Sequence, residues 1–161
     1  GLGDVYKRQD EYRALHAKYS PEPFEGVAGI LRKIRGAGWK LGLVTGKHRR
    51  TAEASLDFYG LRGIFDGVRC GGLGGSVKPE NILSLLREWG ADPRRTWYVG
   101  DVAQDVLDAR AAGIRPVCAA WAKTRLSDLA ELEALRPEAV FGSVGEFGAW
   151  IDGLLDGGAK G

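Results

Sequence analysis

The chain of 161 residues contains no methionine, not even at its first position, and only two cysteines. A translated reading frame normally starts with methionine, so we expect an N-terminus that is processed or incomplete. Cys70 and Cys118 are too few for a disulfide framework or a metal-binding set, and both lie in short apolar segments. We therefore expect buried free thiols, which favour a reducing, cytoplasmic setting.

Long apolar runs and an excess of one charge are also missing. The longest wholly apolar run, residues 117–122, is far shorter than the ~18 residues of a membrane span, and the N-terminus lacks the apolar stretch of a signal peptide. Lys and Arg number 23 against 21 Asp and Glu, which gives a formal net charge of +2. This balance gives no electrostatic reason to expect nucleic acid or an anionic membrane as a partner.

Glycine, in contrast, is abundant, at 25 of 161 residues, which indicates many tight turns or loops in which backbone approaches a ligand. The segment 71–75 (GGLGG) looks like a phosphate-binding loop, but no Gly-Lys-Ser/Thr follows it. Val77 stands where a dinucleotide-binding G-x-G-x-x-G pattern needs its third glycine. We therefore interpret residues 71–76 as a flexible loop.

From about residue 26 the apolar pattern alternates between strand and helix periods, which is typical of an α/β fold. The predicted strands are short apolar runs at 39–44, 67–70, 96–99, 114–119 and 139–141. The predicted helices have apolar residues at helical spacing and lie at 27–34, 48–59, 79–89, 102–112, 126–135 and 144–155. Because the connections are short and the strands are continuously apolar, we expect a parallel sheet covered on both faces.

A hydroxyl and two ammonium groups lie where ligands bind in open parallel sheets, at the carboxyl ends of strands. Thr45, Gly46 and Lys47 directly follow the strand at 39–44, and Lys78 begins the helix after the glycine-rich loop. Lysine side chains and backbone amides neutralise phosphoryl oxygens, so this combination indicates a phosphate site. Taken singly, Thr45 could instead cap the next helix, and Lys78 could be an ordinary surface lysine.

Two carboxylates follow the strand at 96–99. Asp101 comes directly after Gly100, and Asp105 lies four residues further on. Each also has a purely structural interpretation, Asp101 as a helix cap and Asp105 as a first-turn acid favoured by the helix dipole. Mg²⁺ prefers oxygen ligands and is held through one or two carboxylates together with substrate phosphate. Jointly, the carboxylates, the hydroxyl and the ammonium groups predict an Mg²⁺-assisted phosphoryl site.

Three further basic residues, His48, Arg49 and Arg50, continue the sequence after Lys47. This run could help to attract an anionic substrate. The other histidine, His16, is far from His48 in sequence, and the two show no metal-ligand spacing. We therefore interpret both histidines as surface residues.

Three motifs occur in a fixed order: LVTGK in the region 41–47, VKPEN from residue 77, and YVGDVAQDVLDARAAG at 98–113. Thr45 and Lys78 are 33 residues apart, and Lys78 and Asp101 are 23 residues apart. This order resembles the haloacid dehalogenase superfamily of hydrolases, over about residues 10–155. The most similar group is the phosphoglycolate phosphatase-like members, which carry an inserted helical cap. The resemblance implies a Rossmann-like, three-layer α/β/α core around a parallel sheet.

The resemblance also implies an Mg²⁺-dependent phosphatase of small phosphorylated metabolites. Thr45 and the Gly46 amide would hold the transferring phosphoryl oxygens, and Lys78 would neutralise charge on the phosphate and the nucleophile. Asp101 would coordinate Mg²⁺, and Asp105 would support the metal through water or orient Lys78. In the family an aspartate attacks phosphorus to form an aspartyl-phosphate, which water then hydrolyses with the help of a second aspartate.

The sequence departs from the family at the nucleophile. The family's D-x-D-x-[TV] motif, at the end of its first strand, does not occur in these 161 residues. Asp4, in GLGDVYKRQ, follows no apolar strand and has no partner aspartate at the required spacing. We therefore expect a catalytically incomplete fragment without the first strand, the two catalytic aspartates and most of the cap.

Such a fragment would have a gap in its sheet, because the family's first strand lies between those that correspond to 39–44 and 96–99. We expect four segments along the chain: a non-native leader at 1–9, a remnant of a cap helix and linker at 10–23, the hydrolase core at 24–155 and a disordered tail at 156–161.

Two alternatives stay open at this point. The chain could be a non-enzymatic module that keeps this fold to bind phosphate or metal, or a family member of other chemistry, such as a phosphomutase or a dehalogenase. Lys78 and the carboxylates at 101 and 105 favour phosphate and Mg²⁺ over metal-free dehalogenation. The cap sets much of the substrate choice in this family, so the sequence specifies neither the substrate nor the oligomeric state.

Overall fold

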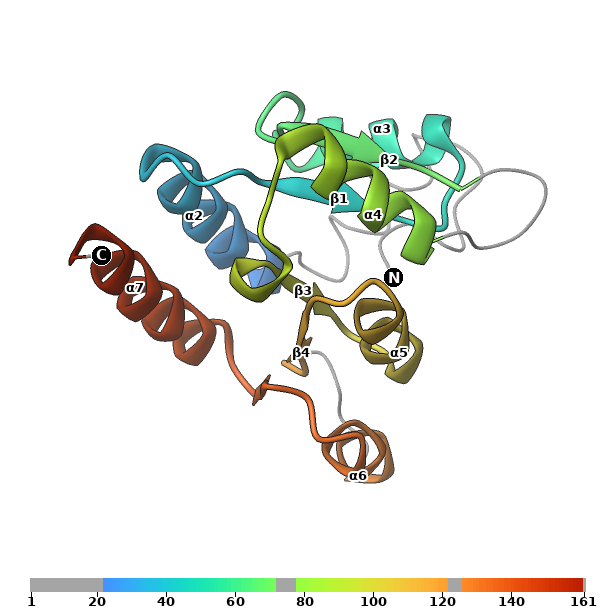
Figure 1. Cartoon of the computed structure of the whole chain (residues 1–161), viewed down its shortest axis with the longest axis vertical. Coiled ribbons are helices and arrows are strands. Elements are labelled where there is room, and N and C mark those ends of the chain that lie inside the picture. The colour runs from blue at the N-terminus through green and yellow to red at the C-terminus, as the bar shows by residue number, and fades with distance from the viewer. Residues whose placement is uncertain (1–21, 72–77, 122–125, 161) are drawn as a thin grey trace. The chain divides into compact units, whose positions relative to one another are not determined.

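The computed structural model describes residues 22–71, 78–121 and 126–160 (Figure 1). The chain divides into two compact units, Gly1–Lys78 and Pro79–Gly161. The expected leader and most of the expected cap remnant lie outside the described residues, as does most of the glycine-rich loop. No helix in the described ranges combines the length and the apolar character that crossing a membrane requires.

The first unit contains two helices and two short strands: α2 (Glu22–Gly36), β1 (Gly42–Val44), α3 (Arg49–Phe58) and β2 (Gly67–Arg69). The strands pair in parallel, with Leu43 opposite Val68. Ala28 of α2 and Leu56 of α3 form the core of this unit together with Leu61, and Leu43 of β1 packs against them. The apolar stripes of both helices therefore face the β1–β2 pair.

In the second unit, strands and helices alternate after α4. Helix α4 itself begins at Lys78, the last residue of the first unit. The elements of the second unit are α4 (Lys78–Trp89), the 3-10 helix η1 (Pro93–Arg95), β3 (Trp97–Gly100), α5 (Ala103–Ala111), β4 (Arg115–Ala119), α6 (Leu126–Ala134), β5 (Ala139–Phe141) and α7 (Val144–Lys160). The strands are parallel in the order β3–β4–β5, with Val117 of β4 opposite both Val99 and Ala139.

The core of the second unit lies around β4. Val106 of α5 and Cys118 of β4 are each 1% exposed, and Leu132 of α6 packs in the same cluster. The aromatic rings of α7 pack on the sheet, since Trp150 lies 5.4 Å from Phe141 of β5 and 6.1 Å from Trp97 of β3, measured between ring centroids. Core packing thus accounts for these tryptophans.

Most predicted elements occur within a few residues of the expected bounds. Gly60, Gly90 and Gly113 follow α3, α4 and α5 with φ of 66°, 61° and 78°, the left-handed conformation in which glycine ends helices. The predicted strand at 39–44 is shorter, because only residues 42–44 join the ladder with β2.

The described strands form two parallel ladders, and none of the described ladders joins β1 to β3. This agrees with the gap expected between the segments 39–44 and 96–99. The strand that the resemblance places between these two is not among the described residues. The helix predicted to end near Leu155 continues, as α7, to Lys160, because glycine weakens a helix without removing a backbone N–H donor. The disorder expected for residues 156–161 stays a prediction.

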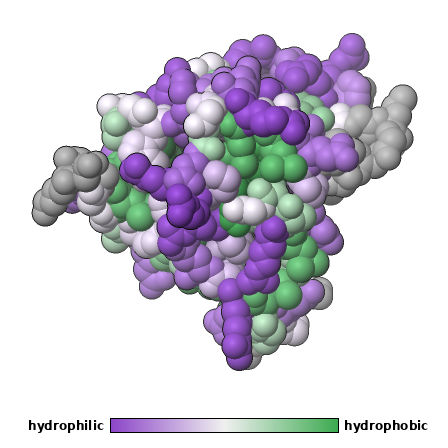
Figure 2. Space-filling view, in the orientation of Figure 1, coloured by the Kyte–Doolittle hydropathy of each residue, from purple (hydrophilic) through white to green (hydrophobic). Residues whose placement is uncertain are grey.

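The visible face of the molecule is mixed, with hydrophilic residues interrupted by smaller hydrophobic patches (Figure 2). Three large apolar residues of the second unit, Val99, Val102 and Leu107, are 40–45% exposed. The two thiols are free: Cys118 is buried as expected, while Cys70 is only half-buried. Burial raises the pKa of both thiols.

Candidate active site

The loop after β1 is held in place by the Thr45 hydroxyl. Thr45 Oγ1 accepts a hydrogen bond from the backbone N–H of Lys47 at 3.1 Å, and the backbone N–H of Thr45 donates to the Arg69 carbonyl at 3.0 Å. The alternative that Thr45 caps the next helix is wrong, because His48 is the N-cap of α3. Thr45 thus forms an ST-turn at the carboxyl end of β1, in which its side-chain hydroxyl bonds the backbone two residues further on.

Lys78 lies alongside this loop. A Cβ atom built on Gly46 would be 3.9 Å from Lys78 Cε, although the two residues are far apart in the sequence. Gly71 closes the other side, because its N–H donates to the Lys47 carbonyl at 2.8 Å and a Cβ on Gly71 would lie 2.1 Å from the Gly46 oxygen. The first unit therefore brings Thr45, Gly46 and Lys78 together, as the sequence predicts.

The close approach of Gly71 is a feature that the sequence analysis missed. The chain offers a signal for it, because Gly71 is the first glycine after β2 and only glycine lacks the Cβ that would meet Gly46. Lys47, which the sequence places in the phosphate site, has its Nζ atom buried. Lys78 is half-buried, and the basic residues from His48 to Arg50 are exposed.

Asp105 organises the turn after β3. Its Oδ2 atom accepts hydrogen bonds from the backbone N–H groups of Asp101 at 3.0 Å and Val102 at 3.3 Å, and the residue is 5% exposed. A Cβ on Gly100 would lie 2.3 Å from Asp105 Cβ, so this turn requires glycine. The structural interpretation of Asp105 as a first-turn acid is thus correct, and the N-cap is Val102 rather than Asp101.

Asp101 is the carboxylate left available in this turn. It is half-buried, and its side chain accepts no hydrogen bond from the described residues. A carboxylate oxygen is a ligand that Mg²⁺ prefers, and one or two carboxylates with phosphate and water complete such a site. Within the described ranges no three His, Cys, Asp or Glu residues form a metal-binding group. A single carboxylate of this kind is compatible with part of an Mg²⁺ site, and the assignment of Asp101 as a metal ligand stays a prediction.

The neighbourhood of the turn is negatively charged. Burial raises the pKa of the Tyr98 phenol above its usual range, and the nearby carboxylates of Asp105, Asp108 and Asp101 raise it further. Asp108 is 6% exposed; its Oδ1 accepts from Gln104 Nε2 at 3.0 Å, and its Oδ2 has no hydrogen-bond partner among the described residues. The sequence analysis missed Asp108, although it lies one helical turn beyond Asp105. Such a region attracts a cation.

The predicted site residues thus fall into two groups, each within its own unit. Thr45, Gly46, Lys47 and Lys78 belong to the first unit, and Asp101 and Asp105 belong to the second. That the two groups form one site stays a prediction.

A model of the haloacid dehalogenase-like hydrolases matches residues 3–119. The chain belongs to this family. A pyrophosphatase PpaX from Halalkalibacterium halodurans is 31% identical over 75% of this chain and 63% of its own length. A phosphoglycolate phosphatase from Aquifex aeolicus is 27% identical over 81% of this chain and 66% of its own length.

Solved structures of the family share the fold. A predicted phosphatase from Clostridium acetobutylicum matches with a TM-score of 0.68 at 20% identity, over 88% of this chain and 67% of that one. A putative β-phosphoglucomutase from Thermotoga maritima matches with a TM-score of 0.62 at 25% identity, over 72% of this chain and 54% of that one. The two curated relatives are matched over 63% and 66% of their own lengths, so the chain spans less than two-thirds of each.

Proposed function

We propose that this chain carries the phosphate-binding and metal-binding residues of an Mg²⁺-dependent phosphatase of small phosphorylated metabolites. The observation that carries the proposal is the approach of Lys78 to the Thr45–Gly46 turn, with Lys78 Cε 3.9 Å from the position of a Gly46 Cβ. An ammonium group beside a backbone turn and a hydroxyl suits the oxygens of a phosphoryl group. Curated relatives named as phosphatases support the same chemistry.

Each residue has a role in this proposal. The Gly46 amide and the Thr45 hydroxyl orient the phosphoryl oxygens, and Lys78 offsets the negative charge that develops on them in the transition state. Asp105 holds the turn that presents Asp101, and Asp101 is the Mg²⁺ ligand. When bound, Mg²⁺ would supply Lewis-acid stabilisation of the phosphoryl oxygens.

The nucleophile of the proposed reaction comes from outside these 161 residues. An aspartate there would attack phosphorus to form an aspartyl-phosphate, the alcohol of the substrate would leave, and water would then release phosphate. The DNA upstream of the Gly1 codon tests this directly. A strand that ends in D-x-D-x-T or D-x-D-x-V supports the proposal, and its absence favours the non-enzymatic module.

Turnover gives the second test. With the upstream segment present, we expect Mg²⁺-dependent release of p-nitrophenol from p-nitrophenyl phosphate, and none from the 161-residue chain alone. Lys78→Ala should lower kcat by about 10²–10³-fold, the effect of losing one donor that stabilises transition-state charge. Asp101→Asn should largely abolish turnover, because it removes the carboxylate charge that would bind Mg²⁺ at nearly constant side-chain volume. Arg87→Gln, at an exposed position on α4, serves as the control and should leave kcat unchanged. Robust turnover by the short chain would show that a nucleophile lies within it.

A further inference from the structure

Two consecutive carbonyl groups of the loop at residues 45–47 contact a single residue that follows β2. The N–H of Gly71 donates to the Lys47 carbonyl at 2.8 Å. The Gly46 carbonyl lies on the face of Gly71 that a side chain would occupy, since an added Cβ would be 2.1 Å from the Gly46 oxygen and 2.7 Å from its carbonyl carbon. Gly71 therefore holds the Gly46–Lys47 peptide in one position.

The direction of this peptide determines how the Thr45 hydroxyl is used. All described peptide bonds are trans, so the Lys47 N–H points away from the Gly46 oxygen and hence away from Gly71. There it donates to Thr45 Oγ1 at 3.1 Å. Because a hydroxyl that accepts a hydrogen bond keeps its own proton to donate, the Thr45 O–H remains a donor for a bound phosphoryl oxygen.

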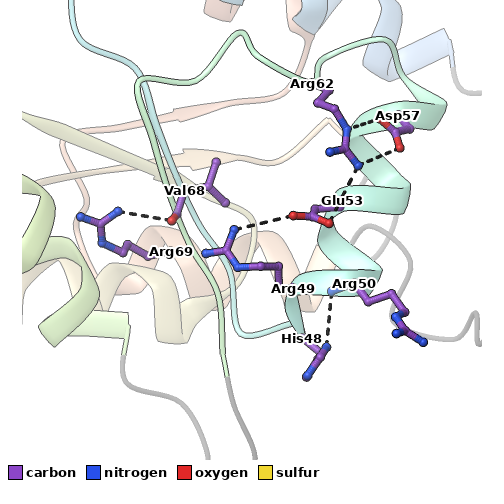
Figure 3. A network of polar contacts seen from close by, with 8 residues as sticks. All are labelled: His48, Arg49, Arg50, Glu53, Asp57, Arg62, Val68 and Arg69. Carbon is purple, nitrogen blue, oxygen red and sulfur yellow. Dashed lines mark hydrogen bonds and ion pairs between the residues drawn. The ribbon is translucent and has the colours of Figure 1, made fainter.

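Both ends of the loop are held by contacts of their own. At its start, the N–H of Thr45 donates to the Arg69 carbonyl of β2 at 3.0 Å. At its end, His48 caps α3 by accepting a hydrogen bond from the backbone N–H of Arg50, as Figure 3 shows. A displacement forced on the loop from residue 71 therefore falls on its middle, at Gly46.

We propose that Gly71 is a positioning residue of the phosphatase site, which acts by holding the peptide that directs the Thr45 hydroxyl and the Gly46 amide toward the phosphoryl group. The inference rests on the proposed function. Gly71 contacts no substrate atom in this proposal and acts only through the loop. A side chain at residue 71 must displace Gly46, and a misplacement of about 1 Å in such a site costs up to about 10²-fold in rate.

The orthophosphate affinity of the 161-residue chain tests the proposal without turnover. In calorimetric titrations Gly71→Ala should weaken orthophosphate binding by at least about tenfold, the effect of losing one charge-assisted hydrogen bond. Two controls separate positioning from loss of stability. Leu56→Ala weakens the apolar core of the same unit, and Gly142→Ala adds a methyl group where nothing lies within 4 Å. At a temperature at which all four chains are folded, both controls should keep the native affinity.

A double variant shows whether Gly71 acts through Thr45. Thr45→Val removes the hydroxyl at nearly constant side-chain volume and should itself weaken orthophosphate binding. Gly71→Ala should then lower the affinity by a smaller factor in the Thr45→Val chain than in the native chain, because the effects of residues that act together are not additive. A purely structural role for Gly71 would give the same factor in both chains.

Hydrogen exchange in the native chain gives a measurement that needs no substitution at residue 71. Orthophosphate should slow the exchange of the Gly71 N–H, because this group bonds the Lys47 carbonyl and a ligand stabilises the state that binds it. The control is the N–H of Ala120, which donates to the Phe141 carbonyl at 2.9 Å in the other unit. Its exchange should slow less.

The outcomes distinguish this inference from the function on which it rests. The inference would be overturned by a native affinity in Gly71→Ala, by an equal loss in Leu56→Ala, by an equal factor in the Thr45→Val chain, or by Gly71 exchange that does not respond to bound orthophosphate. Each of these results would leave the phosphate site intact. Orthophosphate binding that is absent from the native chain, or that is insensitive to Lys78→Ala, would instead overturn the proposed function itself.

Discussion

The two units support their parts of the proposed site with unequal packing. In the second unit the buried apolar side chains are 0–6% exposed, and the sheet has three strands. In the first unit the buried apolar side chains keep 4–8% exposure, and the sheet is two strands of three residues each. A two-stranded sheet is marginal without further packing. The loop at residues 45–47, here called the phosphate loop, therefore belongs to the less well-packed unit. The turn at residues 100–105, here called the carboxylate turn, belongs to the better-packed unit.

The two turns also differ in what holds them. The loop at Thr45 depends on backbone contacts between segments far apart in sequence, above all the approach of Gly71 to Gly46. The turn at Asp101 is local, because Asp105 binds backbone groups only three and four residues away. Local hydrogen bonds survive opening of distant parts of a fold, so we expect the phosphate loop to open more readily than the carboxylate turn.

The largest effect on stability should come from replacing one buried leucine by alanine in each unit. Leu132 is 2% exposed and Leu56 is 8% exposed. Replacing either by alanine should lower the free energy of unfolding by about 2–5 kcal/mol, with Leu132→Ala at the upper end because its site is more completely enclosed. Urea unfolding of the two variants measures both costs. A larger cost at Leu56 would reverse the proposed ranking of the units.

Adding a methyl group at the two close-approach glycines should act next most strongly. In Gly71→Ala the new Cβ meets the Gly46 backbone at 2.1 Å, and in Gly100→Ala it meets Asp105 Cβ at 2.3 Å. Each should cost about 1–3 kcal/mol through forced displacement. Residue-resolved hydrogen exchange should show the loss confined to the substituted unit. Gly142→Ala is the control, because nothing lies within 4 Å of its added Cβ.

Tyr98 should make the stability of the second unit depend on alkaline pH. Its pKa is raised in the folded state, so the folded protein holds the phenolic proton after the unfolded chain has lost it. Stability is therefore retained below pH ~10 and falls above it, by up to about 1.4 kcal/mol per pH unit until the folded group titrates. Tyr98→Phe should flatten this fall. An unchanged pH profile in the variant would show that Tyr98 is not the responsible group.

The smallest effect should come from two exposed helix glycines. Gly29 of α2 and Gly153 of α7 have nothing within 4 Å of an added Cβ and no positive φ. Alanine at either position should stabilise its unit by about 0.5–1 kcal/mol, because alanine loses less backbone entropy than glycine in a helix. Thermal melts measure the gain. If the first unit opens more readily, Gly29→Ala should also slow hydrogen exchange around the phosphate loop, whereas Gly153→Ala should not.

The sequence predicts those features that depend on local chemistry. Helix ends at Gly60 and Gly90 follow from the left-handed conformation that glycine adopts. The turn at Asp101 and Asp105 follows from their spacing at a helix start, and the family follows from the motifs that contain them.

Features that depend on distant contacts could not be predicted in the same way. The grouping of Lys78 with Gly46 was predicted from the positions of both after predicted strands and from the family pattern. The packing of Gly71 on Gly46 leaves only a glycine after a strand as its signal, which does not name the partner. The burial of Asp108 depends on what packs against α5. The predicted end of α7 was wrong because two glycines weaken a helix without removing its hydrogen bonds.

Coupling between Mg²⁺ and phosphate tests most directly whether the two groups of residues form one site. The measurement is the orthophosphate affinity of the 161-residue chain by calorimetry, with and without Mg²⁺, in the native chain and in Asp101→Asn. If Thr45 and Lys78 share a site with Asp101, Mg²⁺ should tighten phosphate binding in the native chain and have no effect in Asp101→Asn, since coupling between ligands is reciprocal. A phosphate affinity that does not change with Mg²⁺, or a coupling that survives in Asp101→Asn, would contradict the account.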